Sequence, residues 1–130
     1  MNFHEITTAM ARDYLRDMAG NPKWDCSSGM CSIEEIIGNG MPFLVIDVGQ
    51  PVAVVVLQHV QHAHGRELVI RVAMQLAACG GLTERVLPEI ERVFGAECQA
   101  VTVYTRRAGL VAKLQNAGYD EAAKIMRKKL

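Results

Sequence analysis

Apolar side chains recur with two different periods along the chain, and the change of period separates helices from strands. Between residues 6–18 every fourth position is apolar, a spacing that predicts the core-facing side of a helix. Those positions are Ile6, Met10, Tyr14 and Met18. Gly-Asn-Pro at 20–22 predicts the end of this helix. A capping box of Ser32 and Glu35 predicts a second, short helix over residues 33–37.

The middle of the chain is rich in β-branched side chains and is broken by turn residues, which predicts strands. We expect three, at 41–49, 51–65 and 66–74. His64-Gly65 resembles a two-residue hairpin loop, which would place His62 opposite Glu67 and His59 opposite Ile70. Side chains would then alternate between the two faces of the sheet. One face would carry Leu68, Ile70, Val72 and Met74, and the other Glu67, Val69 and Arg71.

The last third of the chain predicts a strand between two helices. The spacing of Val86, Ile90 and Val93 indicates a helix over residues 83–95, with Thr83 as a candidate N-cap. Pro88 either kinks this helix or marks a start near Leu87. A strand is expected at 99–105 and a helix at 109–118, and propensity alone favours helix for the tail.

This order of elements predicts an α+β fold with a mixed sheet, in which a hairpin is followed by a βαβ crossover. With 130 residues the chain is expected to form a single domain with a proper core. Fourteen basic and fourteen acidic residues cancel, so no overall field favours nucleic acid or an anionic membrane as a partner. The absence of an export signal or a long apolar run predicts a soluble, cytoplasmic protein whose four cysteines are reduced.

Two groups of residues have metal-ligating chemistry. Cys26 and Cys31 lie within reach of one another, but no second Cys/His pair with finger spacing follows, and free thiols are the alternative. In HVQHAH, a strand would put His62 and His64 on one face and His59 on the other. We therefore predict no metal site.

A loop of small residues, QLAACGG at 75–81, lies between a predicted strand and a predicted helix. At such a place unpaired backbone N–H groups and the helix dipole favour an anion. The alternative is an ordinary turn.

These segments resemble the GNAT superfamily of acyl-CoA-dependent N-acetyltransferases. That family's pyrophosphate loop follows its fourth strand with the pattern Arg/Gln-x-x-Gly-x-Gly/Ala, which QLAACG matches at Gln75 and Gly80, with Ala78 at the first glycine. GLVAKLQNAGY resembles the family's helix ending in Gly-Phe, and AAKIMRKKL resembles its closing strand. The resemblance implies a mostly antiparallel central sheet with flanking helices, and a last strand at 122–129 beside the 99–105 strand. A first strand would have to lie in MNFHEI.

The resemblance implies acetyl-CoA, or CoA, as the cofactor. The backbone of residues 72–74 would align its pantetheine arm, and the amides of 77–81 would hold its diphosphate. The candidate cofactor-binding residues are Val72, Ala73, Met74, Gln75, Ala77, Ala78, Cys79, Gly80 and Gly81.

Proton chemistry has weaker candidates. Many GNAT enzymes have a tyrosine four residues before the Gly of Gly-Phe, and this position is Leu114. Tyr104 is a candidate acid and His59 a candidate base, although each is more typical of a sheet side chain without a catalytic role.

The resemblance thus predicts an N-acetyltransferase whose acceptor amine belongs to a small molecule or a protein. A GNAT-fold binding or structural module without catalysis is the alternative. Pairing through the terminal strand is common in the fold, so a homodimer stays open.

Overall fold

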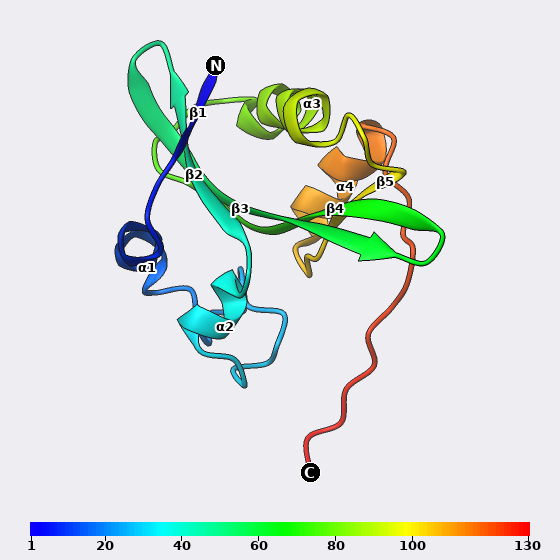
Figure 1. The fold of residues 1–130 in the computed structure, drawn as a ribbon. Coiled ribbons are helices and arrows are strands. Elements are labelled where there is room, and N and C mark those ends of the chain that lie inside the picture. Colours follow the sequence, from blue (N-terminus) through cyan, green and yellow to red (C-terminus); the bar gives the residue numbers. More distant parts are fainter.

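The computed structural model describes all 130 residues and is built around one five-stranded sheet (Figure 1). The strands are β1 (Asn2–Glu5), β2 (Met41–Asp47), β3 (Gln50–His62), β4 (Gly65–Gln75) and β5 (Ala100–Val103), and they lie in this order across the sheet. The first four pair antiparallel, and β5 runs parallel to β4 after the crossover through a helix. The predicted α+β class, mixed sheet and short first strand are therefore confirmed.

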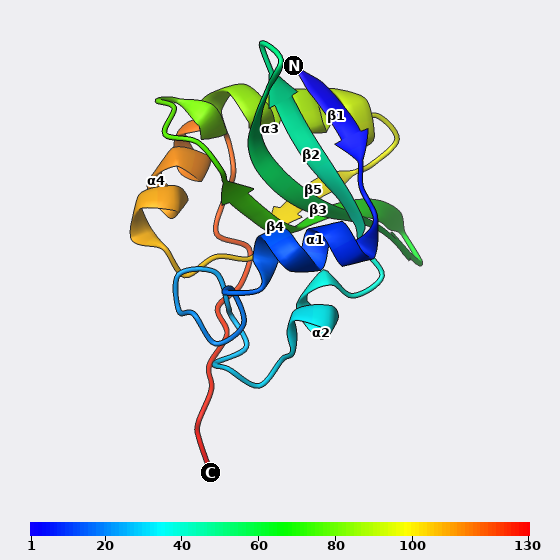
Figure 2. The same cartoon turned by 90° about the vertical axis from the view of Figure 1, so that its left-hand side faces the viewer.

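Four helices cover the two faces of the sheet. They are α1 (Thr8–Leu15), α2 (Ile33–Ile37), α3 (Leu82–Phe94) and α4 (Ala108–Asn116). Figures 1 and 2 show α1 and α2 on one side of the strands and α3 and α4 on the other. None of the four is long and apolar enough to cross a membrane.

Each face of the sheet has its own apolar core. The core under α3 and α4 contains Phe43, Val55, Leu57, Leu68 and Ile70, and Phe94 packs against Phe43 with ring centroids 4.8 Å apart. The core under α1 and α2 is built from seven buried residues: Ala11, Leu15, Met18, Ile37, Val54, Val56 and Val72. The alternation of Val54, Val55 and Val56 between the two cores is the strand periodicity of β3.

The bounds of α1 and the start of α3 differ from the sequence prediction. α1 is shorter than residues 6–18 because Thr7 caps it, accepting a hydrogen bond from the Met10 amide at 3.1 Å. α3 starts at Leu82 after Gly81, whose φ of 67° is left-handed, so Thr83 is not the N-cap. Pro88 lies inside α3 and does not start it. The capping box at Ser32 and Glu35 is confirmed.

The predicted hairpin register is wrong by two residues. The loop is Ala63-His64, so His62 pairs with Gly65 and His59 with Leu68. A shift of two keeps each side chain near the turn on its predicted face. A bulge further along β4 moves the following side chains to the other face. Leu57 pairs with Ile70 but the next pair is Val56 with Val72, so Arg71 is an extra residue in β4. Val72 and Met74 therefore lie on the α1/α2 side, opposite Leu68 and Ile70.

The predicted last strand at 122–129 is absent, and so is the helix that propensity favours. Residues 117–130 form no regular element, and the tail runs away from the sheet (Figure 1). Four of the last seven residues are basic, and Ile125 and Met126 stay 63% and 89% exposed. Ile125 and Met126 therefore bury little apolar surface against the sheet, and nothing offsets the entropy cost of ordering this segment as a strand. Beyond Tyr119 the one side-chain anchor is Arg127, which donates to the Cys26 carbonyl at 2.8 Å and to Ser28 Oγ at 2.7 Å.

Candidate functional site

β4 and β5 separate part-way along their length. Their pairing ends at Ile70 and Val103, directly before the extra residue of the bulge, Arg71. The Arg71 guanidinium reaches across to α2 and donates to the carbonyls of Glu35 and Ile36, each at 3.0 Å. The bulge is thereby fixed to a helix terminus, where unpaired carbonyls accept hydrogen bonds from cations.

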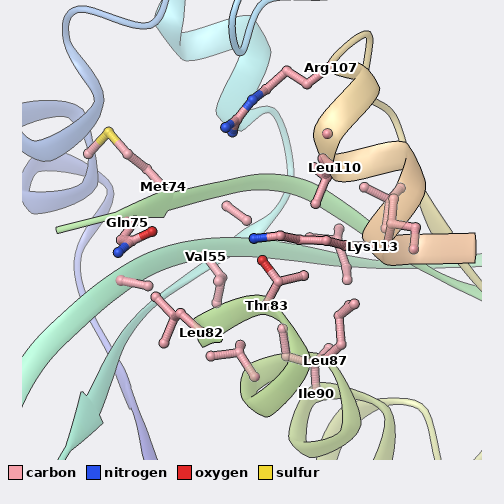
Figure 3. Close-up of a pocket in the computed structure, with 17 residues that line it drawn as sticks. Val55, Met74, Gln75, Leu82, Thr83, Leu87, Ile90, Arg107, Leu110 and Lys113 are labelled. Atoms are coloured by element: carbon pink, nitrogen blue, oxygen red, sulfur yellow. The ribbon is translucent and has the colours of Figure 1, made fainter. Parts of the chain in front are cut away.

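Beyond this point a cavity of about 290 Å³ lies under α3 and α4. Twelve of its 17 lining residues are apolar, including Val55, Ile70, Leu87 and Leu114. Figure 3 shows α3 on one side of it and α4 on another, with Met74 and Gln75 at the end of β4. Its volume and apolar lining suit a slender, mostly apolar chain with a few polar groups.

The free edge of β4 faces this opening. The Leu76 amide donates to the Val52 carbonyl at 2.8 Å, so the alternate residues Met74 and Val72 also direct their polar backbone groups toward β3. Ala73 and Gln75 then direct theirs away from β3, on the side where β5 has ended. The backbone of Ala73 is thus available to hydrogen-bond a molecule in the cavity.

The loop at the end of β4 presents unpaired backbone donors. No backbone N–H of residues 77–84 donates to a protein acceptor, and α3 has no side-chain cap. Gln75 Nε2 donates to the carbonyls of Ala77 at 2.5 Å and Cys79 at 3.3 Å, which holds these carbonyls beside the strand. With the N-terminal end of the α3 dipole, the free N–H groups form a place that favours an anion.

Glycine geometry in the loop differs from what the family pattern suggests. Gly81 alone takes the left-handed conformation, whereas Ala78 does not, so alanine there causes no backbone strain. A Cβ at Gly80 would meet no atom within 4 Å. Arg85 anchors the loop from α3, pairing with Asp47 at 2.5 Å and donating to Cys79 Sγ at 3.3 Å.

The nine residues predicted to bind the cofactor are mostly brought together. Ala73, Met74 and Gln75 line the cavity, and the segment 77–81 forms the loop beside it. Val72 does not line the cavity, since its side chain is 4% exposed in the α1/α2 core.

The two predicted proton-transfer residues lie elsewhere. His59 Nε2 donates to the Phe94 carbonyl at 2.7 Å, at the C-terminal end of α3. Tyr104 follows β5 with 58% of its surface exposed. Neither lines the cavity, whereas Leu114 does and is 7% exposed. Tyr119 is held by a 2.9 Å hydrogen bond to Glu91, and burial together with that carboxylate raises the pKa of Tyr119.

The carboxylates of Asp25 and Glu67 already accept hydrogen bonds from other residues. Asp25 is buried, which opposes its ionisation, but hydrogen bonds from Ser27 and Gly20 outweigh this and lower its pKa. Hydrogen bonds from Thr102 and His62 lower the pKa of Glu67. No Asp, Glu or His lines the cavity. No group of three His, Cys, Asp or Glu side chains is placed to hold a metal ion, and all four cysteines are free.

The sequence reasoning missed three polar residues of the site. Arg107 and Lys113 are the charged residues that line the cavity, and Arg71 fixes the bulge that opens it. Arg107 and Lys113 could have been found from their place at the start and on the inner face of the helix after β5. The role of Arg71 had no signal in the sequence, because the two α2 carbonyls to which it donates lie 35 and 36 residues away.

No protein-family model matches this chain, and no curated protein matches its sequence. Solved structures do match it over their whole length. A putative acetyltransferase from Agrobacterium tumefaciens is 18% identical with a TM-score of 0.62, covering 100% of both chains. An aminoglycoside N-acetyltransferase in complex with CoA is 13% identical with a TM-score of 0.55, covering 99% of this chain and 98% of the other. The chain has a GNAT-like fold.

A transcriptional regulator from Bacillus halodurans has a similar structure, with 12% identity, a TM-score of 0.64 and 99% coverage of both chains. Identities this low establish the fold alone, because one fold carries many functions. Within the GNAT fold, the chain departs from the resemblance in lacking the last strand at 122–129.

Proposed function

We propose that this protein is an acetyl-CoA-dependent N-acetyltransferase that acts on an amine. The observation that carries the proposal is the run of free N–H groups at 77–84, at the end of an apolar cavity between two diverging strands. An anionic diphosphate attached to a slender arm matches both parts of this arrangement.

In this proposal the chain holds the cofactor mainly through its backbone. The amides of 77–81 and the first turn of α3 receive the diphosphate, and Ala73 aligns the pantetheine amides. Lys113 extends from α4 over the cavity on the side of Thr83, where it adds positive charge (Figure 3). Bound acetyl-CoA would supply an acetyl thioester, whose C–S bond breaks as the amine nitrogen bonds to the acetyl carbon, giving an amide and free CoA.

Catalysis here would rest on positioning. Holding two reactants in register supplies much of the rate of a bimolecular reaction, and acid–base groups add roughly 10²- to 10⁴-fold. His59 and Tyr104 do not line the cavity, so this second contribution is not assigned to them.

A second candidate is a GNAT-fold module that binds without catalysing. Leu114 favours it, because this residue brings no hydroxyl to the place where the family resemblance expects an acid. The two candidates differ in whether a bound acetyl thioester is consumed.

Thermal unfolding with acetyl-CoA and with CoA, followed by calorimetry, tests the proposal. A ligand at 100 times its Kd adds about 2.7 kcal/mol to the free energy of unfolding and raises Tm by about 10 °C in a domain of this size. Gly80→Glu places a carboxylate beside the free N–H groups and should abolish the shift. Gly80→Ala is the matched control and should keep it, since a Cβ there is unobstructed. No shift in the wild-type protein, or an equal shift in Gly80→Glu, would overturn the assignment.

A further inference from the structure

The side of the cavity that faces α1 and α2 carries unpaired positive charge. Figure 3 shows Met74 and Arg107 on the opposite side of β4 from Thr83 and Leu87. Met74 lines the cavity and also packs against the core under α1 and α2, together with Trp24. The gap between β4 and β5 therefore opens toward the segment that joins α1 to α2.

Two further cations add to this charge. Arg106 directly precedes Arg107 in the chain, and together with Arg127 it opposes the rise that burial causes in the pKa of the Cys26 thiol. Arg127 is also hydrogen-bonded there, to the Cys26 carbonyl and to Ser28 Oγ. We call Arg106, Arg107 and Arg127 the arginine rim.

No carboxylate neutralises the arginine rim. None of the five ion pairs of the molecule involves any of its members. Asp25 is the acid beside Cys26, but it is 3% exposed and its oxygens accept hydrogen bonds from Gly20 and Ser27. Residues 104–130 carry seven basic and two acidic residues, in a chain whose overall charge is zero.

Arg107, the member of the rim that lines the cavity, lies where an acceptor would approach. The free N–H groups at 77–84 place the diphosphate at the N-terminus of α3, so the acyl end lies in the cavity between the strands. A thioester at that gap is reachable from the face of the sheet that carries α1 and α2.

We infer that the acceptor is a small amine that also carries an anionic group, which the arginine rim binds. The inference rests on the proposed function. Arg–carboxylate and Arg–phosphate contacts are the stronger charged hydrogen bonds in proteins. The same cations disfavour an ammonium ion and so favour the neutral amine that attacks the thioester, in a cavity without an acidic base. A polycationic amine, such as an aminoglycoside, is repelled.

Matched acceptor pairs test the inference by following CoA thiol release from acetyl-CoA. The pairs are L-phenylalanine with phenethylamine, and phosphoethanolamine with ethanolamine, with kanamycin as the polycation. We expect at least about a tenfold higher kcat/KM for the anionic member of a pair, corresponding to about 1.4 kcal/mol. The phenylalanine pair reports the effect of a carboxylate on kcat/KM, and the phosphoethanolamine pair reports the effect of a phosphate.

Charge reversal assigns the effect to the arginine rim. Arg106→Glu and Arg127→Glu should each raise KM for the anionic acceptor, with the calorimetric Kd for acetyl-CoA unchanged. Ser28→Ala loosens the tail anchor without changing charge and should have a smaller effect. Arg66→Glu makes the same charge change at the hairpin end of β4 and should have none.

The outcomes separate the two proposals. If acetyl-CoA binds but phenethylamine, ethanolamine or kanamycin is acetylated at least as well as the anionic acceptors, the inference is wrong and the acetyltransferase proposal stands. If Arg106→Glu and Arg127→Glu behave like Arg66→Glu, the rim is not the site. If acetyl-CoA does not bind at all, both proposals fail together.

Discussion

Arg71 Nε donates to the carbonyl of Ile36 at 3.0 Å, which joins the bulge of β4 to the last turn of α2. The same guanidinium donates to Glu35 and to Gln58, so one side chain ties together a helix terminus and two strands. β4 and β5 cease to pair at Ile70, directly before Arg71, and the cavity begins there. The opening thus depends on a residue that does not line it.

Replacing this anchor should weaken both the fold and the site. Arg71→Met removes three charged hydrogen bonds and leaves the α2 carbonyls without partners, which should lower the free energy of unfolding by about 2 kcal/mol. Arg71→Lys keeps the charge but cannot reach three acceptors at once, so it should recover less than half of the loss. Denaturant unfolding measures the stability, and calorimetry at a temperature where both variants are folded should show weaker acetyl-CoA binding. Unchanged affinity in folded Arg71→Met would mean that the bulge does not need its anchor.

Leu114 is the place to add a proton donor. Leu114→Tyr should put a hydroxyl at the cavity and leave any acetyl transfer rate unchanged or raise it, because general acids contribute roughly 10²- to 10⁴-fold. Leu114→Phe has the same ring without the hydroxyl, so the ratio of the two kcat values isolates the effect of the hydroxyl group. A Tyr variant that is folded, binds acetyl-CoA and is much slower than wild type would show that this face of α4 has another role.

Local patterns were enough to predict most elements, and long-range contacts decided what they missed. Each strand from β2 to β5 and the capping box at Ser32 follow from short segments whose period or hydrogen bonds are local. The bulge does not, since it is fixed by Arg71 through α2, more than 30 residues away. It reverses the faces of Val72 and Met74, which strict alternation cannot anticipate.

In the candidate site, too, local features could be predicted from the sequence and long-range placement could not. Backbone features at 73–81 could be located from the small residues between a strand and a helix, because N–H groups do not depend on side-chain identity. His59 and Tyr104 were chosen by chemistry alone, and the fold directs His59 to the Phe94 carbonyl instead. The predicted last strand came from the family resemblance, and it does not form, because Ile125 and Met126 stay exposed instead of packing on the sheet.

Removal of the tail separates stability from function. Residues 121–130 are exposed, so deleting them should change the free energy of unfolding by less than about 0.5 kcal/mol. The deletion also removes Arg127 and should raise KM for an anionic acceptor without altering acetyl-CoA affinity. Thermal unfolding and steady-state kinetics of the shortened chain are the measurements. A large loss of stability would show that the tail packs on the domain after all.

Glu67 gives the molecule a specific sensitivity to acid. Hydrogen bonds from Thr102 and His62 lower its pKa in the folded state below the ordinary value of 4.5. A carboxyl whose folded pKa is depressed contributes stability that is present above the unfolded pKa and is lost as pH falls through the folded pKa. Thr102→Val removes the hydrogen bond that lowers the pKa of Glu67 most. It should therefore reduce the free energy of unfolding most above about pH 5, and the difference in that free energy from wild type should narrow as pH falls below 4.5. Thr102→Ser keeps the hydroxyl and should follow the wild-type curve. Denaturant unfolding of the three proteins between about pH 3 and pH 6 measures this, and parallel curves for Thr102→Val and wild type would exclude Glu67 as the source.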